Sequence, residues 1–309
     1  MDMQLPSTAI LGAGLMGIGI AVHVARHGHG VRLFDPDPAR LQAIPAAARG
    51  ILAELADAGR FDPQDTDAVL ARLDTAERLA DVADAGWLIE AVPERLPLKQ
   101  ALYAELEALI DAGAIIASNT SGLPPDELAA RMRHPERLLI AHFWNPPHVI
   151  PLVELVPGSA TDRALLEQVR GWLDGMQLEA VVLEKAVPGF IGNRLQFALL
   201  REALAIVQSG IADAATVDRV VRASLGRRYG MVGPLEGADM GGLDTFADIA
   251  RHLLPRLAQG TDGLDLLERK VREGKTGVRS GEGFYRWDDA RRERIAQRRL
   301  HLLRHGLKP

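Results

Sequence analysis

The sequence contains no cysteine, few aromatic residues (5%) and no long apolar run. The missing thiols exclude disulfides, thiolate zinc sites, cysteine-ligated iron–sulfur clusters and a cysteine nucleophile. No apolar stretch approaches the roughly 18 to 20 residues of a membrane helix, and the first residues lack the basic start and the small-residue cleavage site of a secretory signal. We therefore expect a soluble, cytoplasmic protein.

Charge and length narrow the class further. The 36 Lys and Arg are outnumbered by 41 Asp and Glu, so the net charge is −5 and no broad positive field favours nucleic acid or a membrane as a partner. Residues 286–309 are an exception, because they are basic, and we expect a solvated or subunit-facing helix there. A chain of 309 residues, 47% of them hydrophobic, is long enough for two domains.

The first half of the chain alternates short β-branched runs with helical patterns, which predicts a doubly wound α/β domain with a largely parallel sheet. The expected strands are 8–11, 31–34, 87–92, 114–118, 138–143, 151–156 and 178–183. The expected helices are 15–27, 97–111, 124–132 and 160–176. A further helical stretch, 39–73, has a turn at 58–60, and we expect it to stand off the sheet as a helical hairpin.

The pattern becomes helical after Pro188. Helices are expected over 190–210, 212–224 and 242–260 and in the basic segment after Trp287. A boundary near residue 185 therefore divides an α/β domain, 1–185, from an all-α domain, 186–309. Helical domains of this size commonly carry an oligomer interface or close over a cleft, and composition does not choose between these roles.

Three glycines between the first expected strand and helix predict a phosphate-binding turn. Gly12 permits a tight turn, Gly14 lets the backbone approach a pyrophosphate, and Gly17 allows close packing of helix and strand. The backbone of Leu15 and Met16 starts the helix that attracts the phosphate charge. A turn merely rich in small residues would show the same glycines, but the flanking strand and helix favour a Rossmann-type dinucleotide site.

An acidic residue lies where the ribose of a dinucleotide would be bound. Asp35 ends the second expected strand, 18 residues after Gly17. Its carboxylate would accept hydrogen bonds from the ribose hydroxyls and would repel a 2′-phosphate. The predicted cofactor is therefore NAD and not NADP.

One histidine and one glutamate form a candidate proton-transfer pair. His142 ends an expected strand, and Glu154 follows twelve residues later inside an apolar strand, where a lone charge is costly. If the proline-rich loop between them reverses the chain, the carboxylate meets the imidazole and fixes its tautomer. Spacing alone leaves a purely structural pair open. His23 and His27 lie four residues apart but lack a third ligand, so we expect packing or surface positions and no metal site.

Four ordered motifs resemble the L-3-hydroxyacyl-CoA dehydrogenase family. They are the glycine turn at 12–17, Ser118-Asn119-Thr120-Ser121, the run from His142 to Glu154, and Pro188-Gly189-Phe190-Ile191-Gly192-Asn193-Arg194. The resemblance extends from about residue 8 to the segment 281–285. It implies an NAD-binding Rossmann-type domain, an all-helical substrate and dimerisation domain, a homodimer, and a place in fatty-acid metabolism.

The resemblance also implies roles for single residues. His142 matches the catalytic base, and Glu154 matches the carboxylate that orients it. Ser121 and Asn193 match residues that hydrogen-bond the reacting oxygen. Without the family, Ser121 would be interpreted as a turn or capping residue and Asn193 as an ordinary polar residue in a helix.

Three further residues are implied to contact the cofactor. Glu94 and Lys99 match positions that line the nicotinamide-ribose side of the cleft. Asn119, in the motif that ends at Ser121, is expected to bind the cofactor as well. These assignments rest on the resemblance.

The substrate stays open between two classes. Arg227 and Arg228 resemble the lambda-crystallin and L-gulonate 3-dehydrogenase branch, and a guanidinium holds a small carboxylate well. Residues 39–73 contain no lysine, whereas acyl-CoA members often supply lysines there for the CoA phosphates. Segments 239–245 and 277–285 instead resemble the acyl-CoA branch. The first expectation is an L-3-hydroxyacyl-CoA, the second a free 3-hydroxy acid such as L-gulonate, and the third a non-catalytic NAD-binding structural protein.

Overall fold

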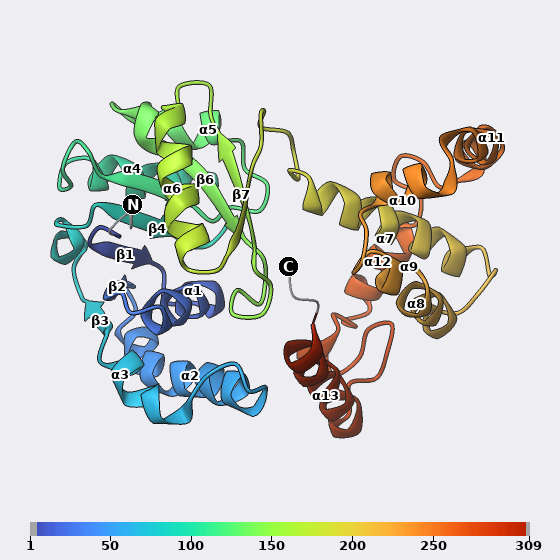
Figure 1. Ribbon diagram of the computed structural model, residues 1–309, viewed down its shortest axis with the longest axis horizontal. Coiled ribbons are helices and arrows are strands. Elements are labelled where there is room, and N and C mark those ends of the chain that lie inside the picture. The colour runs from blue at the N-terminus through green and yellow to red at the C-terminus, as the bar shows by residue number, and fades with distance from the viewer. Residues whose placement is uncertain (1–4, 307–309) are drawn as a thin grey trace. The chain divides into compact units, whose positions relative to one another are not determined.

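The computed structural model describes residues 5–306, which divide into two compact units between Ile191 and Gly192 (Figure 1). The sequence predicts this division near residue 185. The first unit is built around a β-sheet, and the second is helical. In the described part of the chain, no helix is long and apolar enough to cross a lipid bilayer.

An eight-stranded sheet, in the order β3-β2-β1-β4-β5-β6-β7-β8, forms the centre of the first unit. Its strands are β1 Thr8–Leu11, β2 Val31–Phe34, β3 Leu73–Ala76, β4 Trp87–Glu90, β5 Ile115–Ser118, β6 Leu138–Phe143, β7 Leu152–Pro157 and β8 Glu179–Val182. All neighbouring strands are parallel except β6 and β7. The loop between β6 and β7 is too short for a parallel crossover, which needs a dozen or more residues, so the chain turns back on itself.

Helices cover both faces of the sheet. They are α1 Leu15–Arg26, α2 Pro38–Asp57, α3 Thr66–Leu70, α4 Leu96–Leu106, α5 Pro125–Ala129 and α6 Arg163–Gly175. Side chains alternate between the faces of a strand, so Ile89 packs in the cluster with α1 and α6 while Leu88 packs in the cluster with α4 and α5. The predicted doubly wound α/β architecture of this unit is confirmed.

The segment after β2 is helical with a turn near residues 58–60, as expected, but its second helical arm is shorter than predicted. Helix α2 buries Leu41, Ile44 and Leu52 in the same core cluster as α1, because its apolar residues recur at helical spacing on one face. The chain turns at Gly59, where φ is 69°, and a 3-10 turn at Pro63–Asp65 and the short helix α3 follow. Leu73, expected to end the helical stretch, instead begins β3, which is largely exposed and therefore lacks an apolar pattern.

The second unit is all-helical. Its helices are α7 Gly192–Gln208, α8 Ala214–Ala223, α9 Leu225–Arg228, α10 Pro234–Gly241, α11 Leu243–Leu253, α12 Leu264–Arg272 and α13 Asp289–His305. The sequence predicts helices at α7, α8, α11 and α13. It does not predict α9, α10 or α12, which are short, so few turns of helical periodicity exist to be recognised.

Candidate active site and cofactor turn

Glycine occupies the positions of the turn after β1 for two different structural reasons. Gly12 has φ 108°, and a Cβ there would lie 2.7 Å from the carbonyl oxygen of Ala91. A Cβ on Gly17 would lie 1.9 Å from the carbonyl oxygen of Gly12. Gly14 differs, because a Cβ there would meet no heavy atom within 4 Å. Two glycines therefore allow the close packing of the turn, and Gly14 leaves space at the start of α1.

The N-terminus of α1 faces this space without a capping side chain. Gly14 is the N-cap residue in extended conformation, and among the described residues no side chain caps the first turn. The first N–H groups of a helix have no carbonyl partner within the helix, and the helix dipole adds a partial positive charge. Leu15 is 70% exposed, so the entrance is open. The residues present therefore fit the pyrophosphate of a dinucleotide.

Asp35 connects the second strand to this turn. Its buried carboxylate accepts hydrogen bonds from the backbone N–H of Ala13 at 2.9 Å and of Asp37 at 3.0 Å. Arg40 lies 3.6 Å from it. Each carboxylate oxygen can accept more than one hydrogen bond, so these contacts leave room for a ribose hydroxyl. The ribose-binding role of Asp35 stays a prediction.

His142 and Glu154 face each other across the antiparallel strands β6 and β7. They are direct partners in the register, and Nδ1 of His142 lies 3.0 Å from Oε2 of Glu154. Both side chains are buried, and the backbone N–H of Ile191 donates to Oε1 at 2.9 Å. A carboxylate only accepts, so Nδ1 carries the proton of the neutral ring. In residues 5–306, Nε2 of His142 has no hydrogen-bond partner, so this nitrogen can take a proton.

Lys99 lies inside a buried network. Its ammonium is 2.7 Å and 2.9 Å from the two oxygens of Glu90 and 3.0 Å from Oε2 of Glu94. The Lys99 side chain is 1% exposed, whereas Glu94 is half exposed. Burial raises the pKa of Glu94, but the hydrogen bond from the Thr120 hydroxyl and the Lys99 charge outweigh it and hold that pKa below its usual value. The charge of Lys99 therefore fixes the Glu94 side chain. Because Glu94 is half exposed and Lys99 is buried, Glu94 is the better placed of the two for the predicted contact with the cofactor.

Glu90 is the centre of this network, although its role is not among those predicted from the sequence. Its fully buried carboxylate also accepts from the Tyr103 hydroxyl at 2.6 Å and the Ser118 hydroxyl at 2.7 Å. Burial and the adjacent carboxylate raise the pKa of Tyr103 well above its ordinary value. The sequence did carry a signal for Glu90, namely a carboxylate at the end of the apolar strand β4. A carboxylate in an apolar strand is also the pattern that identified Glu154.

Asn119 and Ser121 lie in the loop after β5. The side-chain oxygen of Asn119 accepts from the backbone N–H of Phe143 at 2.8 Å, which ties this loop to the residue after His142. The backbone N–H of Ser121 donates to Glu94 at 3.0 Å. The loop thus connects the cofactor-side network to the strand that carries the base. The predicted contacts of Asn119 with cofactor and of Ser121 with substrate stay predictions.

Asn193, Arg227 and Arg228 belong to the second unit. Asn193 is the second residue of α7, and the two arginines end α9 with exposed side chains. Within the described chain, neither arginine side chain forms an ion pair or a hydrogen bond, in contrast to Arg40 and Arg49 of α2, which pair with aspartates. The assignment of Asn193 to the reacting oxygen and of the arginines to a substrate stays a prediction.

A Rossmann-type sheet, an open glycine turn and a buried histidine–carboxylate pair together define a nicotinamide-dependent dehydrogenase. Residues 7–187 match the family described as 3-hydroxyacyl-CoA dehydrogenase, NAD binding domain, and residues 189–287 match 3-hydroxyacyl-CoA dehydrogenase, C-terminal domain. The chain belongs to the 3-hydroxyacyl-CoA dehydrogenase family, and its cofactor is NAD.

The names of relatives in this family refer to different substrates. A 5-formyl-3-hydroxy-2-methylpyridine 4-carboxylate 5-dehydrogenase of Mesorhizobium japonicum is 34% identical, with 91% of each chain covered. A solved structure of such a dehydrogenase, described as an NAD+ dependent dismutase, has a TM-score of 0.89 at 32% identity and covers 97% of this chain and 96% of that one. A probable 3-hydroxybutyryl-CoA dehydrogenase of Bacillus subtilis is 33% identical, covering 93% of this chain and 99% of that one.

Proposed function

We propose that the protein uses NAD to interconvert a secondary alcohol and a ketone in a small, free 3-hydroxy acid. The observation that carries the catalytic part is the buried contact of 3.0 Å between His142 and Glu154. Bound NAD would supply the acceptor for the hydride of the alcohol carbon. His142 takes the hydroxyl proton at Nε2, and Glu154 stabilises the imidazolium that forms.

The loop after β5 supports this chemistry from the cofactor side. Glu94 holds the backbone of Ser121, and Lys99 holds Glu94. The Ser121 hydroxyl is thereby presented on a loop whose backbone is fixed, and in the proposal it stabilises the developing charge on the reacting oxygen. Asn193 acts on the same oxygen.

The helix after β2 favours a free acid over a CoA thioester. α2 contains no lysine, and Arg40 and Arg49 are paired with carboxylates of their own unit. Cations that are already neutralised bind CoA phosphates poorly. Arg227 and Arg228, which have no such partner among the described residues, suit a small carboxylate. The carboxylate in the name of the M. japonicum relative is consistent with this class.

The second candidate is an L-3-hydroxyacyl-CoA, which the B. subtilis relative favours. Initial rates of NADH formation separate the two candidates, with free C4 to C6 3-hydroxy acids, including L-gulonate and carnitine, compared with 3-hydroxybutyryl-CoA at equal concentrations. We expect kcat/KM to be higher for a free acid. Turnover of the thioester alone would overturn the free-acid proposal, and binding of NADH without any turnover would favour the non-catalytic alternative.

We further propose that two copies of the chain assemble through the second unit. Its buried large apolar side chains, among the residues described, are Leu204, Val217, Leu266 and Leu303. Many more are exposed, including Leu195, Phe197, Leu199, Leu235, Met240, Leu243, Phe246, Ile249 and Leu253. So small a core does not offset the entropy of ordering this many residues, so the exposed apolar surface needs a cover.

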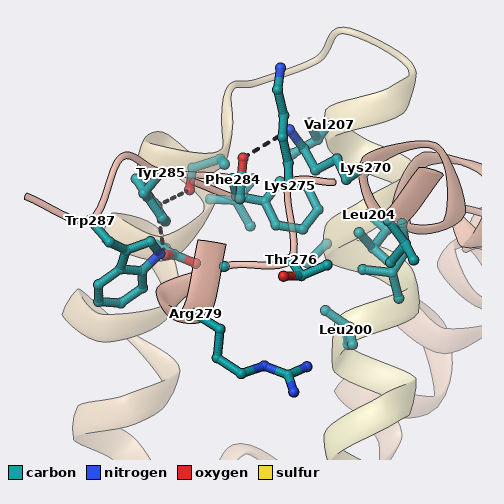
Figure 2. Close-up of a pocket in the computed structure, with 18 residues that line it drawn as sticks. Leu200, Leu204, Val207, Lys270, Lys275, Thr276, Arg279, Phe284, Tyr285 and Trp287 are labelled. Atoms are coloured by element: carbon teal, nitrogen blue, oxygen red, sulfur yellow. Dashed lines mark hydrogen bonds between the residues drawn. The ribbon is translucent and has the colours of Figure 1, made fainter. Parts of the chain in front are cut away.

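A pocket within this unit suits a helix of the second copy. It has a volume of about 500 Å³ and is lined by apolar residues of α7, α8 and α12 and by Phe284 (Figure 2). The apolar stripe of α11, formed by Leu243, Phe246, Ile249 and Leu253, is exposed. Apolar complementarity therefore favours α11 of a second copy as the occupant.

A further inference from the structure

We propose that Trp144 is a positioning residue that sets the proton affinity of His142 through the carboxylate that both side chains contact. The inference rests on the proposed role of His142 as the base. Nε1 of Trp144 donates to Oε2 of Glu154 at 3.2 Å, and Nδ1 of His142 lies 3.0 Å from the same oxygen. The two rings are 5.9 Å apart and tilted by 57°.

The strand geometry brings the indole to this oxygen. Strand β6 ends at Phe143, and residues two apart along an extended chain point to the same side. Trp144 therefore follows His142 on the same side of the chain, just beyond the register that pairs His142 with Glu154. With the backbone N–H of Ile191 on Oε1 and the indole on Oε2, both oxygens of Glu154 are held and the carboxylate cannot rotate freely.

A survey of the charged groups around His142 indicates that Trp144 acts through Glu154. In the described chain, Glu154 is the ionised side chain that contacts His142. Strand β5, on the other side of β6, carries none, and Glu90 beyond it is neutralised by Lys99. Strand β8, beside β7, begins with Glu179, and the chain after it carries Lys185 and Glu184, the latter paired with Arg163.

The shared oxygen makes the two contacts compete. A hydrogen bond from the indole draws negative charge from Oε2, so less of it is available to stabilise a protonated His142. In the proposal, Trp144 thereby lowers the proton affinity of His142, and the strength of a general base follows its proton affinity. A side chain of similar shape without the N–H group would leave that charge to the imidazolium.

The test is an NMR titration of the His142 ring in the full-length protein without substrate or NAD. Trp144→Phe removes the donor and keeps an aromatic ring, and we expect it to raise the pKa of His142 by about half to one pH unit. Trp144→Leu, a second variant, should raise it as well. Trp87→Phe is the matched control, since the indole N–H of Trp87 has no hydrogen-bond partner in the described structure, and the His142 pKa should not move.

A double-mutant cycle separates this effect from a loss of packing. In Glu154→Gln the shared charge is gone, so adding Trp144→Phe should change the His142 pKa no further. In active variants, the acid limb of kcat/KM should move to higher pH with Trp144→Phe while KM for NAD stays constant. An unchanged or lowered His142 pKa in Trp144→Phe, or a rise that persists in the Glu154→Gln background, would overturn the inference. The titration uses no substrate, so its outcome does not depend on the proposed reaction.

Discussion

At the scale of single residues, burial decides what each polar group does. Glu90 and Lys99 are buried together and neutralise each other, and Glu154 is buried against His142. Apolar surroundings make an unpaired charge costly, so a charged residue in an apolar strand indicates that a partner lies nearby. This rule identified Glu154 from the sequence. It could have identified Glu90 too, but the side-chain partners of Glu90 lie on α4 and at the end of β5, and spacing along the chain does not reveal them.

His23 gives a prediction about stability and pH. It is buried on α1, with Nε2 2.9 Å from the carbonyl oxygen of Met176. Burial, together with the nearby Arg26, lowers its pKa to about 3 from 6.5. The unfolded chain therefore binds a proton below pH 6.5 that the folded chain refuses. The stabilisation is present above pH 6.5 and is lost as the pH falls toward 3, at about 1.4 kcal/mol per pH unit.

His23→Gln removes this titration, so its free energy of unfolding should fall less steeply between pH 6.5 and 4. Urea unfolding followed by circular dichroism at several pH values measures the slope. His305→Gln, at an exposed position in α13, is the control and should keep the wild-type slope. Parallel pH curves for wild type and His23→Gln would contradict the assignment.

At the scale of elements, the regular units of the α/β domain could be predicted, and the irregular ones could not. Strands β1, β2 and β6 have the predicted bounds: β1 and β6 are buried throughout, and β2 alternates buried Val31 and Leu33 with half-buried residues. Strand β3 lies at the sheet edge and is mostly exposed, so it carries no such pattern. The expected contact of His142 with Glu154 is present, because a short loop fixes an antiparallel register. The hydrogen bond from Trp144 to Glu154 could not be predicted in this way, because it depends on how the two strands pair in three dimensions.

The turn before α1 allows cofactor binding to be separated from folding. A Cβ on Gly14 would meet no heavy atom of the described residues within 4 Å, so Gly14→Val should still fold, with a melting temperature lowered by only a few degrees because valine is a poorer N-cap than glycine. The added side chain would occupy the space at the helix N-terminus, and we expect NAD affinity, measured by isothermal titration calorimetry, to fall by about tenfold or more. Gly50→Ala in α2, also in open space, should leave NAD affinity unchanged. Wild-type affinity in Gly14→Val would exclude the turn as the pyrophosphate site.

At the scale of the whole molecule, the two units differ in how much apolar surface they bury. The first unit has a continuous core on each face of its sheet. The second leaves the apolar stripe of α11 exposed, although its residues recur at helical spacing. The helical periodicity of α11 could be predicted from the sequence. The surface that covers its apolar stripe could not, because in the proposed assembly a second chain would supply that surface.

Phe246→Gln tests the proposed assembly. Phe246 lies on the apolar stripe of α11, so the polar side chain should weaken the dimer and shift the mass measured by light scattering toward the monomer at micromolar concentration. Arg251→Gln, on the opposite face of the same helix, should remain dimeric. A wild-type protein that is monomeric at every concentration would contradict the assembly.

The most direct test of the central claim is NADH formation by the His142→Ala variant, compared with wild type on the preferred substrate. We predict that kcat falls by about 10² to 10⁴ because the proton acceptor is gone, while the dissociation constant for NAD stays unchanged. Wild-type turnover in His142→Ala would contradict the assignment of His142 as the base.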